Sequence, residues 1–458
     1  MIRVPLAPAP ISTACQRHGR LGFGIGRRFL FLLLLALSWV IPAFWNPRFV
    51  YAVLAWDAIV LLAFVIDYLR LPKPAELIVE RAWLAAPSLS NPTEVQLTLK
   101  NQAKLGITGA LLDDLPLELL EQTATLRLSV PGQTASSTSY SILPSQRGDL
   151  TARQVYVRYQ SAAQLAERWA VANLRQTVRI YPDLEDVKRH SMYLVRSRQI
   201  ELQKRTLRHR GLGREFESLR EYQEGDEFRD ICWTATARRG KLVTKLHQME
   251  RSQAVWIVVD SGRLLRARVE GLCKLDYAIN AALTLAHLAL HSGDRVGLLA
   301  YGRRSFQRLP PARGSAHLRQ ILDKLAVVQP EIAEADHIKA ASNLMWLQKR
   351  RSLVVWLTDL AETSMTPEVI EGASKLLSRH LVLFVVIAQP DLRRMAMQRP
   401  ANREQMYETV AAQDMMQRRE LLLSRLRQRG ALAVEVAPGS LSTGLVNQYL
   451  AIKERNLL

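Results

Sequence analysis

Two apolar runs lie next to each other near the start of the chain. They cover residues 29–45 and 49–69, and only residues 46–48 separate them. A hydrocarbon core about 30 Å thick needs roughly 20 helical residues, with about 17 as the lower limit. The runs therefore predict two transmembrane helices joined as a hairpin, within residues 27–70. A signal peptide followed by one anchor is the alternative, but no Ala-x-Ala-like cleavage site precedes Trp45.

Short segments in which apolar and polar residues alternate follow the apolar runs. They extend over residues 75–182, and turns that contain Pro and Gly separate them. A period of two is the side-chain repeat of a strand with one buried face, so these segments predict a small β-sandwich. Residues 183–250 are basic and lack sustained alternation, which predicts a connector. Residues 1–26 are expected to form a basic cytoplasmic N-terminal segment.

Continuous apolar strands alternate with helical patterns from residue 251 to residue 458. This arrangement is typical of a parallel sheet that is covered by helices on both faces. The predicted fold class of this part is α/β, an open doubly wound sheet. Ligands of such sheets bind outside the carboxyl ends of the strands. Asp260 and Asp359 each end an apolar strand, so we expect both carboxylates in one crevice.

The formal net charge of +20 predicts attraction to something acidic. Arg27 and Arg28 precede the apolar runs and Arg70 and Lys73 follow them, whereas the turn between the runs holds only Arg48. By the positive-inside rule, both termini and the soluble domains are cytoplasmic. Anionic lipid of the inner leaflet then accounts for the basic surplus, at up to about 1 kcal/mol for each nearby Lys or Arg.

Asp57 is an unusual residue because it lies inside the second apolar run. A carboxyl group in a membrane costs a few kcal/mol and by default indicates a function. In an antiparallel hairpin, however, Ser38 lies at about the same depth. A protonated Asp57 that bonds Ser38 would lock the two helices together, and we favour this interpretation.

A dense block of charged and aromatic residues leads into the first strand of the predicted sheet. It covers residues 219–245 and reads LREYQEGDEFRDICWTATARRGKLVTK. With this block the chain resembles domain-of-unknown-function family number fifty-eight, bacterial membrane proteins that carry a von Willebrand factor A-like domain. The residues that carry the resemblance are Arg220, Glu221, Tyr222, Gly225, Asp226, Arg229, Ile231, Trp233, Ala237 and Arg238.

The resemblance implies a doubly wound domain of the von Willebrand type, which usually binds Mg²⁺ through an Asp and two hydroxyls on one loop, a Thr on a second and an Asp on a third. Here Asp260 and Asp359 stand at such positions, and Ser261 and Asp336, the latter near the expected position of the Thr, are candidate helping ligands. Gly262 and Leu264 stand where hydroxyl groups are expected, so the site is degenerate.

Mg²⁺ needs several well-placed oxygen ligands, so we expect at most weak binding at this degenerate site and no other cofactor. Serine at both position 262 and position 264 is expected to restore affinity. The alternative is that Asp260 and Asp359 cap the helices that follow them by accepting backbone N–H bonds.

The sequence lacks the GxxxxGK[ST], HExxH, GxSxG and CxxC patterns. We therefore expect a non-enzymatic protein-interaction platform in the bacterial inner membrane. The resemblance adds a partner, a MoxR-type AAA+ ATPase, with which the chain would act as an adaptor or assembly factor.

Residues 219–245 would supply either a docking face or an ion-pair and aromatic clamp. A nucleic-acid-binding membrane protein and a metal-dependent hydrolase are the alternatives for the whole chain. The sequence leaves the client and the oligomeric state open.

Overall fold

The computed structural model describes residues 6–19, 22–40, 46, 48–119, 125–183, 215–223, 228–248, 253–304, 306–360, 366–455 and 457. The chain forms two compact units, Val4–Tyr181 and Pro182–Leu458, each of which is described by itself. Gly225, Asp226 and most of the predicted connector lie outside the described residues.

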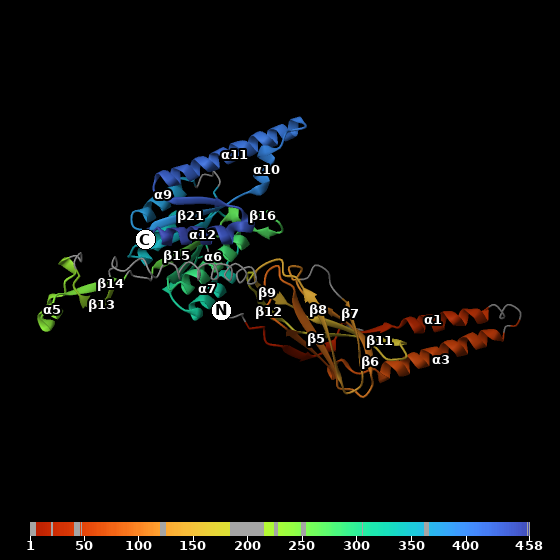
Figure 1. Ribbon diagram of the computed structural model, residues 1–458. Coiled ribbons are helices and arrows are strands. Elements are labelled where there is room, and N and C mark those ends of the chain that lie inside the picture. Colours follow the sequence, from red (N-terminus) through yellow and green to blue (C-terminus); the bar gives the residue numbers. More distant parts are fainter. Residues whose placement is uncertain are drawn as a thin grey trace. The chain divides into compact units, whose positions relative to one another are not determined.

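The first unit contains the expected β-sandwich (Figure 1). One sheet has the order β1 (Ile11–Ala14), β4 (Leu77–Trp83), β5 (Thr93–Asn101) and β8 (Ala135–Ile142). The other has the order β2 (Gln16–Arg17), β11 (Ala166–Ala172), β10 (Val155–Gln160), β6 (Ile107–Asp113) and β7 (Thr125–Val130), and β3 (Phe23–Ile25) also pairs with β11. Strands β9 (Gly148–Ala152) and β12 (Gln176–Ile180) form a separate pair, and the 3-10 helix η2 (Pro74–Glu76) precedes β4. Alternate residues of β4 and β5 are buried, as a period of two requires.

The N-terminal segment differs from the expected tail because β1, β2 and β3 belong to the sandwich. Strand β1 pairs with β4 in antiparallel register from Ile11 opposite Arg81 to Ala14 opposite Ile78. Strands β2 and β3 both pair with β11. Strands this short carry little periodicity, yet they cover edges that would otherwise expose unpaired backbone groups.

Two helices leave the sandwich and pack side by side (Figure 1). The first consists of α1 (Arg27–Leu35) and the 3-10 helix η1 (Ala36–Trp39), and the second is α3 (Phe49–Arg70). Trp56 Nε1 donates to the Leu32 carbonyl at 2.9 Å. Among the described helices, α3 alone is long and apolar enough to cross a membrane, so the transmembrane hairpin is not confirmed.

The structure does not form the expected lock between Ser38 and Asp57. Ser38 Oγ donates to the Leu35 carbonyl of its own helix at 2.7 Å, a bond that helical Ser commonly makes. Asp57 Oδ1 is buried and has no hydrogen-bond partner among the described residues.

Asp67, near the end of α3, is a carboxylate whose role the sequence did not reveal. It accepts hydrogen bonds from Ser161 Oγ at 2.5 Å, Leu165 N at 3.2 Å and Ala166 N at 3.0 Å. Arg168 Nη2 donates to the Tyr68 carbonyl at 2.9 Å. The loop between β10 and β11 therefore fixes the end of α3 to the sandwich.

The second unit contains an open sheet with the order β19-β18-β15-β20-β21-β22. Its strands are β15 (Ala254–Asp260), β18 (Arg295–Tyr301), β19 (Phe306–Ala312), β20 (Leu353–Thr358), β21 (Leu381–Ile387) and β22 (Leu432–Val436). All neighbours are parallel except β18 and β19. Chain order reverses between β15 and β20, so the loops after these two strands lie beside each other.

Helices cover both faces of this sheet, as the continuous apolar strands predict (Figure 1). Helix α6 (Lys274–His291) packs against α7 (Ser315–Ala326) and α12 (Leu441–Glu454). Helices α8 (His337–Leu347), α9 (Thr366–Leu377) and α11 (Arg403–Gln428) share a core with Trp256, Trp356 and Phe384. Helix α10 (Pro390–Met397) packs on α11.

Smaller elements complete the second unit. Strands β13 (Glu215–Glu221) and β14 (Val243–Gln248) form a hairpin that also carries η3 (Phe228–Asp230) and α5 (Trp233–Arg239). The remaining elements are η4 (Arg263–Arg266), the pair β16 (Arg268–Val269) and β17 (Leu272–Cys273), and η5 (Pro438–Ser440).

A buried ion pair joins the two sheets of the sandwich. Arg81 on β4 contacts both carboxylate oxygens of Asp113 on β6, with Nε donating to Oδ2 at 2.9 Å. Arg81 Nη1 also donates to the Leu174 carbonyl at 2.7 Å, and Tyr140 Oη donates to Asp113 Oδ2 at 2.6 Å. Burial, followed by the charge of Asp113, raises the pKa of Tyr140, so its hydroxyl stays protonated and able to donate.

We predict that Arg81→Met destabilises the sandwich by about 3–5 kcal/mol, because it leaves Asp113 charged and buried without its cation. Arg179→Met is the matched control, since the Arg179–Asp149 pair is bidentate but solvent-exposed and is worth at most about 1 kcal/mol. Hydrogen exchange of β4 and β6 amides in the full chain measures both effects. Equal loss of protection in the two variants would contradict the prediction.

Candidate functional site

Asp260 ends β15 at the point where the strand order reverses. Its Oδ2 accepts the Thr358 hydroxyl at 2.6 Å, and its Oδ1 accepts the Gly262 N–H at 2.7 Å. The side chain is buried, and this burial raises its pKa, while nearby His337 and the two hydrogen bonds oppose the rise. Both oxygens of the carboxylate are therefore occupied by groups of the chain itself.

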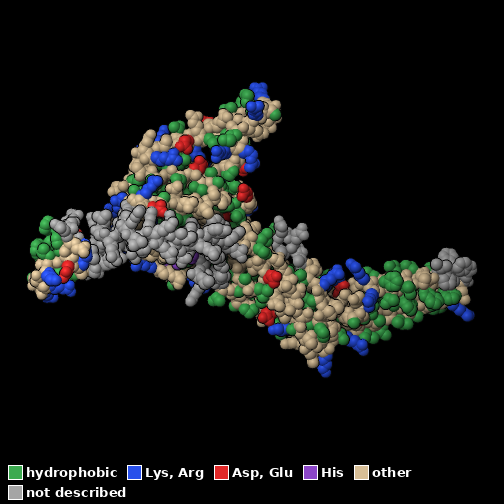
Figure 2. Space-filling model, viewed as in Figure 1, with side chains coloured by type: hydrophobic (Ala, Val, Ile, Leu, Met, Phe, Trp, Pro, Cys, Tyr) green, Lys and Arg blue, Asp and Glu red, His purple; other side chains and the backbone are tan. Residues whose placement is uncertain are grey.

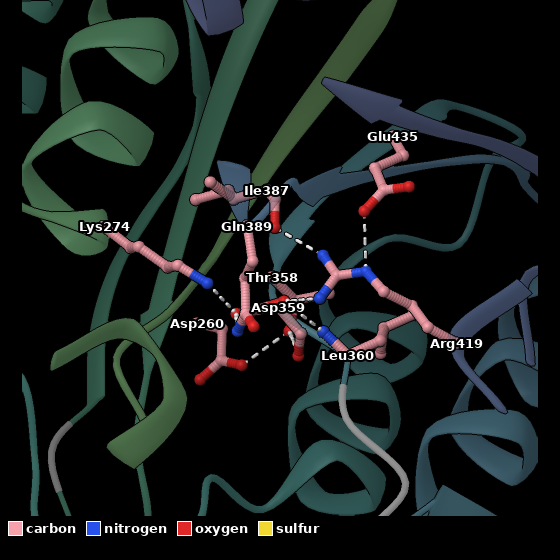
Figure 3. A network of polar contacts seen from close by, with 9 residues as sticks. All are labelled: Asp260, Lys274, Thr358, Asp359, Leu360, Ile387, Gln389, Arg419 and Glu435. Atoms are coloured by element: carbon pink, nitrogen blue, oxygen red, sulfur yellow. Dashed lines mark hydrogen bonds and ion pairs between the residues drawn. The ribbon is translucent and has the colours of Figure 1, made fainter. Parts of the chain in front are cut away.

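Asp359 follows β20 and is held between two cations (Figure 3). Lys274 Nζ, from the first turn of α6, lies 2.5 Å from Oδ2. Arg419 Nη1, from α11, lies 2.9 Å from Oδ1. The Leu360 N–H donates to Oδ1 at 2.8 Å, and Gln389 Nε2 donates to Oδ2 at 3.3 Å.

Arg419 extends the network to two further strands. Its Nη2 donates to the Ile387 carbonyl at the end of β21, and its Nε lies 2.7 Å from Glu435 Oε1 on β22 (Figure 3). Arg419 is buried and spans from Asp359 to Glu435. Burial lowers the pKa of Lys274 below its ordinary value, and the adjacent Asp359 carboxylate opposes this shift only in part.

The other two predicted metal ligands are also engaged elsewhere. Ser261 Oγ donates to the Tyr301 carbonyl at 2.9 Å. Asp336 precedes α8, and its Oδ1 accepts the Lys339 N–H at 2.9 Å as a helix cap. The four predicted residues thus stand on the loops where we expected them, but each donates to or accepts from a group of the chain.

These residues do not fit an Mg²⁺ ion. The ion needs about six oxygen ligands at 2.0–2.1 Å. Here the Lys274 ammonium already contacts Asp359, and no group of three or more His, Cys, Asp or Glu side chains among the described residues could hold a metal. Asp260 and Asp359 both accept backbone N–H bonds, as the alternative expects, but η4 has no side-chain cap and α9 begins only at Thr366, so neither bond caps a helix.

The expectation that serine at position 262 restores a metal site is corrected by the packing around Gly262. A Cβ atom there would lie 2.8 Å from the backbone nitrogen of Ala335 and 3.1 Å from its Cβ. Backbone cannot move aside as cheaply as a flexible side chain, so any larger residue must displace the loop.

Residues 219–245 form their own small structure on the β13–β14 hairpin. The Tyr222 and Phe228 rings lie 6.1 Å apart, Ile231 is buried, and the Cys232 N–H donates to the Val243 carbonyl at 2.8 Å. Helix α5 ends at Gly240, whose φ of 67° suits glycine. Tyr222 and Ile231 therefore help to hold this hairpin together.

Other residues of this block point to solvent. Phe228 and Trp233 are 77% and 66% exposed, and Arg238 is exposed as well. Lys241 Nζ lies 3.2 Å from Glu221 Oε1 in an exposed pair. The structure describes Arg220 but not the side chain of Arg229. We call Phe228, Trp233 and Arg238 the signature surface. Because these side chains are exposed, the docking face stays an interpretation of this block, as does the clamp.

Lys274 and Arg419 are the site residues that the sequence analysis missed. Lys274 begins a helix that is apolar over most of its surface, so its ammonium group has little access to solvent. A lysine in such a helix should have prompted a search for a carboxylate at the end of a strand. Arg419 gave no comparable signal, since it lies in a helix rich in charged residues.

Solved structures similar to this chain include von Willebrand A domains. The SpRpn10 VWA domain is 13% identical, with a TM-score of 0.28, and covers 43% of this chain and 94% of that one. BatB from Bacteroides thetaiotaomicron is 13% identical, with a TM-score of 0.29, and covers 44% and 99%. The PilB minor pilin from Streptococcus sanguinis is 8% identical, with a TM-score of 0.33, and covers 76% and 88%.

Relatives by sequence are uncharacterised proteins. YeaD of Bacillus subtilis (strain 168) is 26% identical over 248 residues, which are 52% of this chain and 59% of that protein. Rv1480 of Mycobacterium tuberculosis (strain ATCC 25618 / H37Rv) is 28% identical over 151 residues, 32% of this chain and 48% of that protein. The chain thus spans about half the length of these relatives. Residues 218–420 match the model described as "Protein of unknown function DUF58", so this part of the chain is similar to that family, as the resemblance predicted.

Proposed function

We propose that this chain is a non-enzymatic, membrane-anchored platform for protein binding. The observation that carries the proposal is the internal pairing of the candidate site. Asp260 and Asp359 are both occupied by groups of the chain, with Lys274 and Arg419 neutralising Asp359. Surface contact, rather than bond-making chemistry, is what this arrangement offers. Magnesium therefore has no part in the proposed function.

The signature surface is the proposed docking site for the partner. Trp and Arg dominate the residues whose truncation weakens protein interfaces most. Trp233 and Arg238 lie on the exposed side of α5, and Phe228 lies on η3 just before it. The buried Ile231 and the hairpin hold these side chains on a structured base, which limits the entropy lost on binding.

Helix α3, together with the segment that starts with α1, is the proposed anchor in the bacterial inner membrane. Only 6% of the most apolar window of α3 is buried within the chain, unlike the core helix of a soluble protein. Figure 2 shows apolar side chains over the visible face of α1 and α3. Arg28 lies at the start of α1, and Arg70 is the last residue of α3. Anionic lipid would attract both side chains.

The proposed partner is a MoxR-type AAA+ ATPase, with the chain as its adaptor or assembly factor. This partner comes from the family resemblance, and the signature surface gives it a place to bind. The soluble domains would face the cytoplasm, where such an ATPase has access to ATP.

We predict that the C-terminus is cytoplasmic, because basic residues flank the apolar runs and the turn between them has only Arg48. Alkaline phosphatase fused after Leu458 should be inactive, and a fluorescent protein fused there should fluoresce. Phosphatase fused after Arg48 serves as the periplasmic control and should be active. An active C-terminal phosphatase would overturn the topology.

We predict that Phe228→Ser combined with Trp233→Ser lowers binding of the ATPase at least tenfold, since one hot-spot aromatic is worth about 2 kcal/mol or more. The measurement is quantitative mass spectrometry of the AAA+ protein that co-purifies with the full chain from detergent-solubilised membranes. Trp346→Ser, which removes an aromatic residue of similar exposure from α8, is the matched control and should bind normally. Absence of an ATPase from the wild-type eluate would refute the proposed partner.

We predict that Gly262→Ser with Leu264→Ser gains no Mg²⁺ affinity and lowers the thermal stability of the sheet domain, because the added Cβ meets the Ala335 backbone. Calorimetry with Mg²⁺ and thermal unfolding of the full chain measure the two effects. Gly439→Ser is the control, because a Cβ at Gly439 meets nothing within 4 Å. Micromolar Mg²⁺ binding by the wild type, lost in Asp260→Ala or Asp359→Ala, would restore the metal-dependent view.

A further inference from the structure

Asp57, in the first half of α3, is a carboxyl group that the fold leaves unsatisfied. Its Oδ1 is buried and has no hydrogen-bond partner among the described residues, and the side chain as a whole is half-buried. Asp67 on the same helix offers a contrast, because it accepts three hydrogen bonds from the sandwich. Buried polar groups are nearly always hydrogen-bonded, so Asp57 calls for a partner.

Depth in the proposed anchor limits what this partner can be. Asp57 is the ninth of the 22 residues of α3. At 1.5 Å per residue, it lies about 12 Å from the start of the helix and about 20 Å from its end. The carboxyl is therefore deep within a hydrocarbon core about 30 Å thick, where lipid headgroups are out of reach and water is scarce. Another transmembrane segment is then the source of a hydrogen bond.

The exposed side of α3 next to Asp57 is an apolar row. Side chains three or four positions apart share one face of a helix. Leu54 and Leu61, three positions before Asp57 and four after it, are 60% and 59% exposed. Exposed residues recur along this row at steps of four, three and four, the spacing by which two long helices pack together. We call this set the outer row, and it consists of Leu54, Ala58, Leu61 and Val65.

Asp57 lies between the outer row and the face of α3 that packs on the first helix. On that inner face, Trp56 Nε1 donates to the Leu32 carbonyl, and Val60 is buried. The last torsion of an aspartate side chain is broad, so the carboxyl can turn from the inner face to the outer row. Ala58 is small, and small residues let two membrane helices approach closely. A helix packed on the outer row therefore reaches Asp57.

A second copy of the chain supplies the group that Asp57 needs. Two copies that insert in the same direction bring their Asp57 residues to the same depth, and a twofold axis then places identical faces against each other. A neutral carboxyl has one O–H donor and free acceptor capacity, so two of them can bond each other. Residues 49–69 contain no Lys, Arg or His, so the two outer rows meet without repulsion between cations.

We propose that two copies of the chain associate in the membrane through the outer row, with the two Asp57 carboxyls hydrogen-bonded to each other. This inference rests on the proposed membrane anchor and adds an occupant for the outer row. A span of another protein that carries Lys or Arg is a poorer occupant, because it requires an ionised Asp57 and therefore the desolvation of two charges. The neutral pair requires none.

The test measures self-association of the full chain in vesicles of phosphatidylethanolamine and phosphatidylglycerol. Donor and acceptor fluorescent proteins fused after Leu458 report association as energy transfer, which is followed against the protein-to-lipid ratio. Asp57→Leu should raise the ratio at half-maximal transfer about tenfold, the effect of losing a strong interhelical hydrogen bond. Asp57→Asn should stay within about twofold of the wild type, because an amide is also both donor and acceptor. Ser38→Ala is the control and should change nothing, since the Ser38 hydroxyl bonds its own helix.

Cysteine cross-linking in membranes tests which face of α3 is used. Leu54→Cys and Leu61→Cys should form disulfide-linked dimers on oxidation with iodine, with the chain that has only its native cysteines as the blank. Ile59→Cys is the matched control, because Ile59 is 62% exposed at nearly the same depth but lies two positions from Asp57 and so on another face. It should cross-link no more than the blank.

Three results would overturn the proposal: a wild type that stays monomeric at every ratio, an Asp57→Leu variant that associates as the wild type does, or equal cross-linking at all three positions. An Asp57→Asn variant as weak as Asp57→Leu would also overturn it, in favour of a cation-bearing span of another protein.

Carbonate extraction separates this proposal from the proposed anchor. A wild type that carbonate strips from the membrane refutes the anchor, and association through the outer row fails with it. A wild type that stays in the membrane but does not associate refutes the outer row alone. Neither result touches the ATPase test at Phe228 and Trp233, which stands or falls separately.

Discussion

The position of Asp359 between Lys274 and Arg419 is the constraint on which the architecture of the sheet domain depends. A carboxylate this deeply buried is costly unless cations compensate it. The two cations come from α6 and α11, helices that pack with different neighbours, and Arg419 continues to Glu435 on β22. One carboxylate at the reversal of strand order thus ties together two helices and the far edge of the sheet.

The same pairing distinguishes this site from one that holds a metal ion. In an Mg²⁺ site the carboxylates turn their oxygens toward an ion that takes further ligands from a partner. In this chain an ammonium group on a helix contacts Asp359, and the Thr358 hydroxyl satisfies Asp260. Because the Lys274 ammonium belongs to the chain, it cannot dissociate or be removed by a chelator. The groups at this edge of the sheet are therefore held together without an added ion.

Much of the architecture was predicted from the spacing of apolar residues, because burial of one or both faces of an element gives a regular pattern of apolar positions in the sequence. The alternation of β4 and β5 and the continuous apolar strands of the sheet are examples. Strands β1 to β3 were not foreseen, since segments of two to four residues are too short to show a period. The transmembrane pair was predicted from apolar length, and the structure supports that length for α3 alone among the described helices.

The sequence predicted where the candidate site lies, but not which groups pair with its carboxylates. Asp260 and Asp359 lie where strand order places them, yet the two cations that pair with Asp359 come from residues 85 positions before it and 60 positions after it, which no local pattern connects. Asp67 shows the same limit, because its partners at Ser161, Leu165 and Ala166 are about a hundred residues away.

The loop between β10 and β11 covers residues 161–165 and reads SAAQL. The Ser161 hydroxyl, the Leu165 N–H and the N–H of Ala166 at the start of β11 all donate to the single carboxylate of Asp67 near the end of α3. These three hydrogen bonds to Asp67 therefore mark the point where the apolar helix joins the folded domain, and a change in this short loop would alter the attachment of α3.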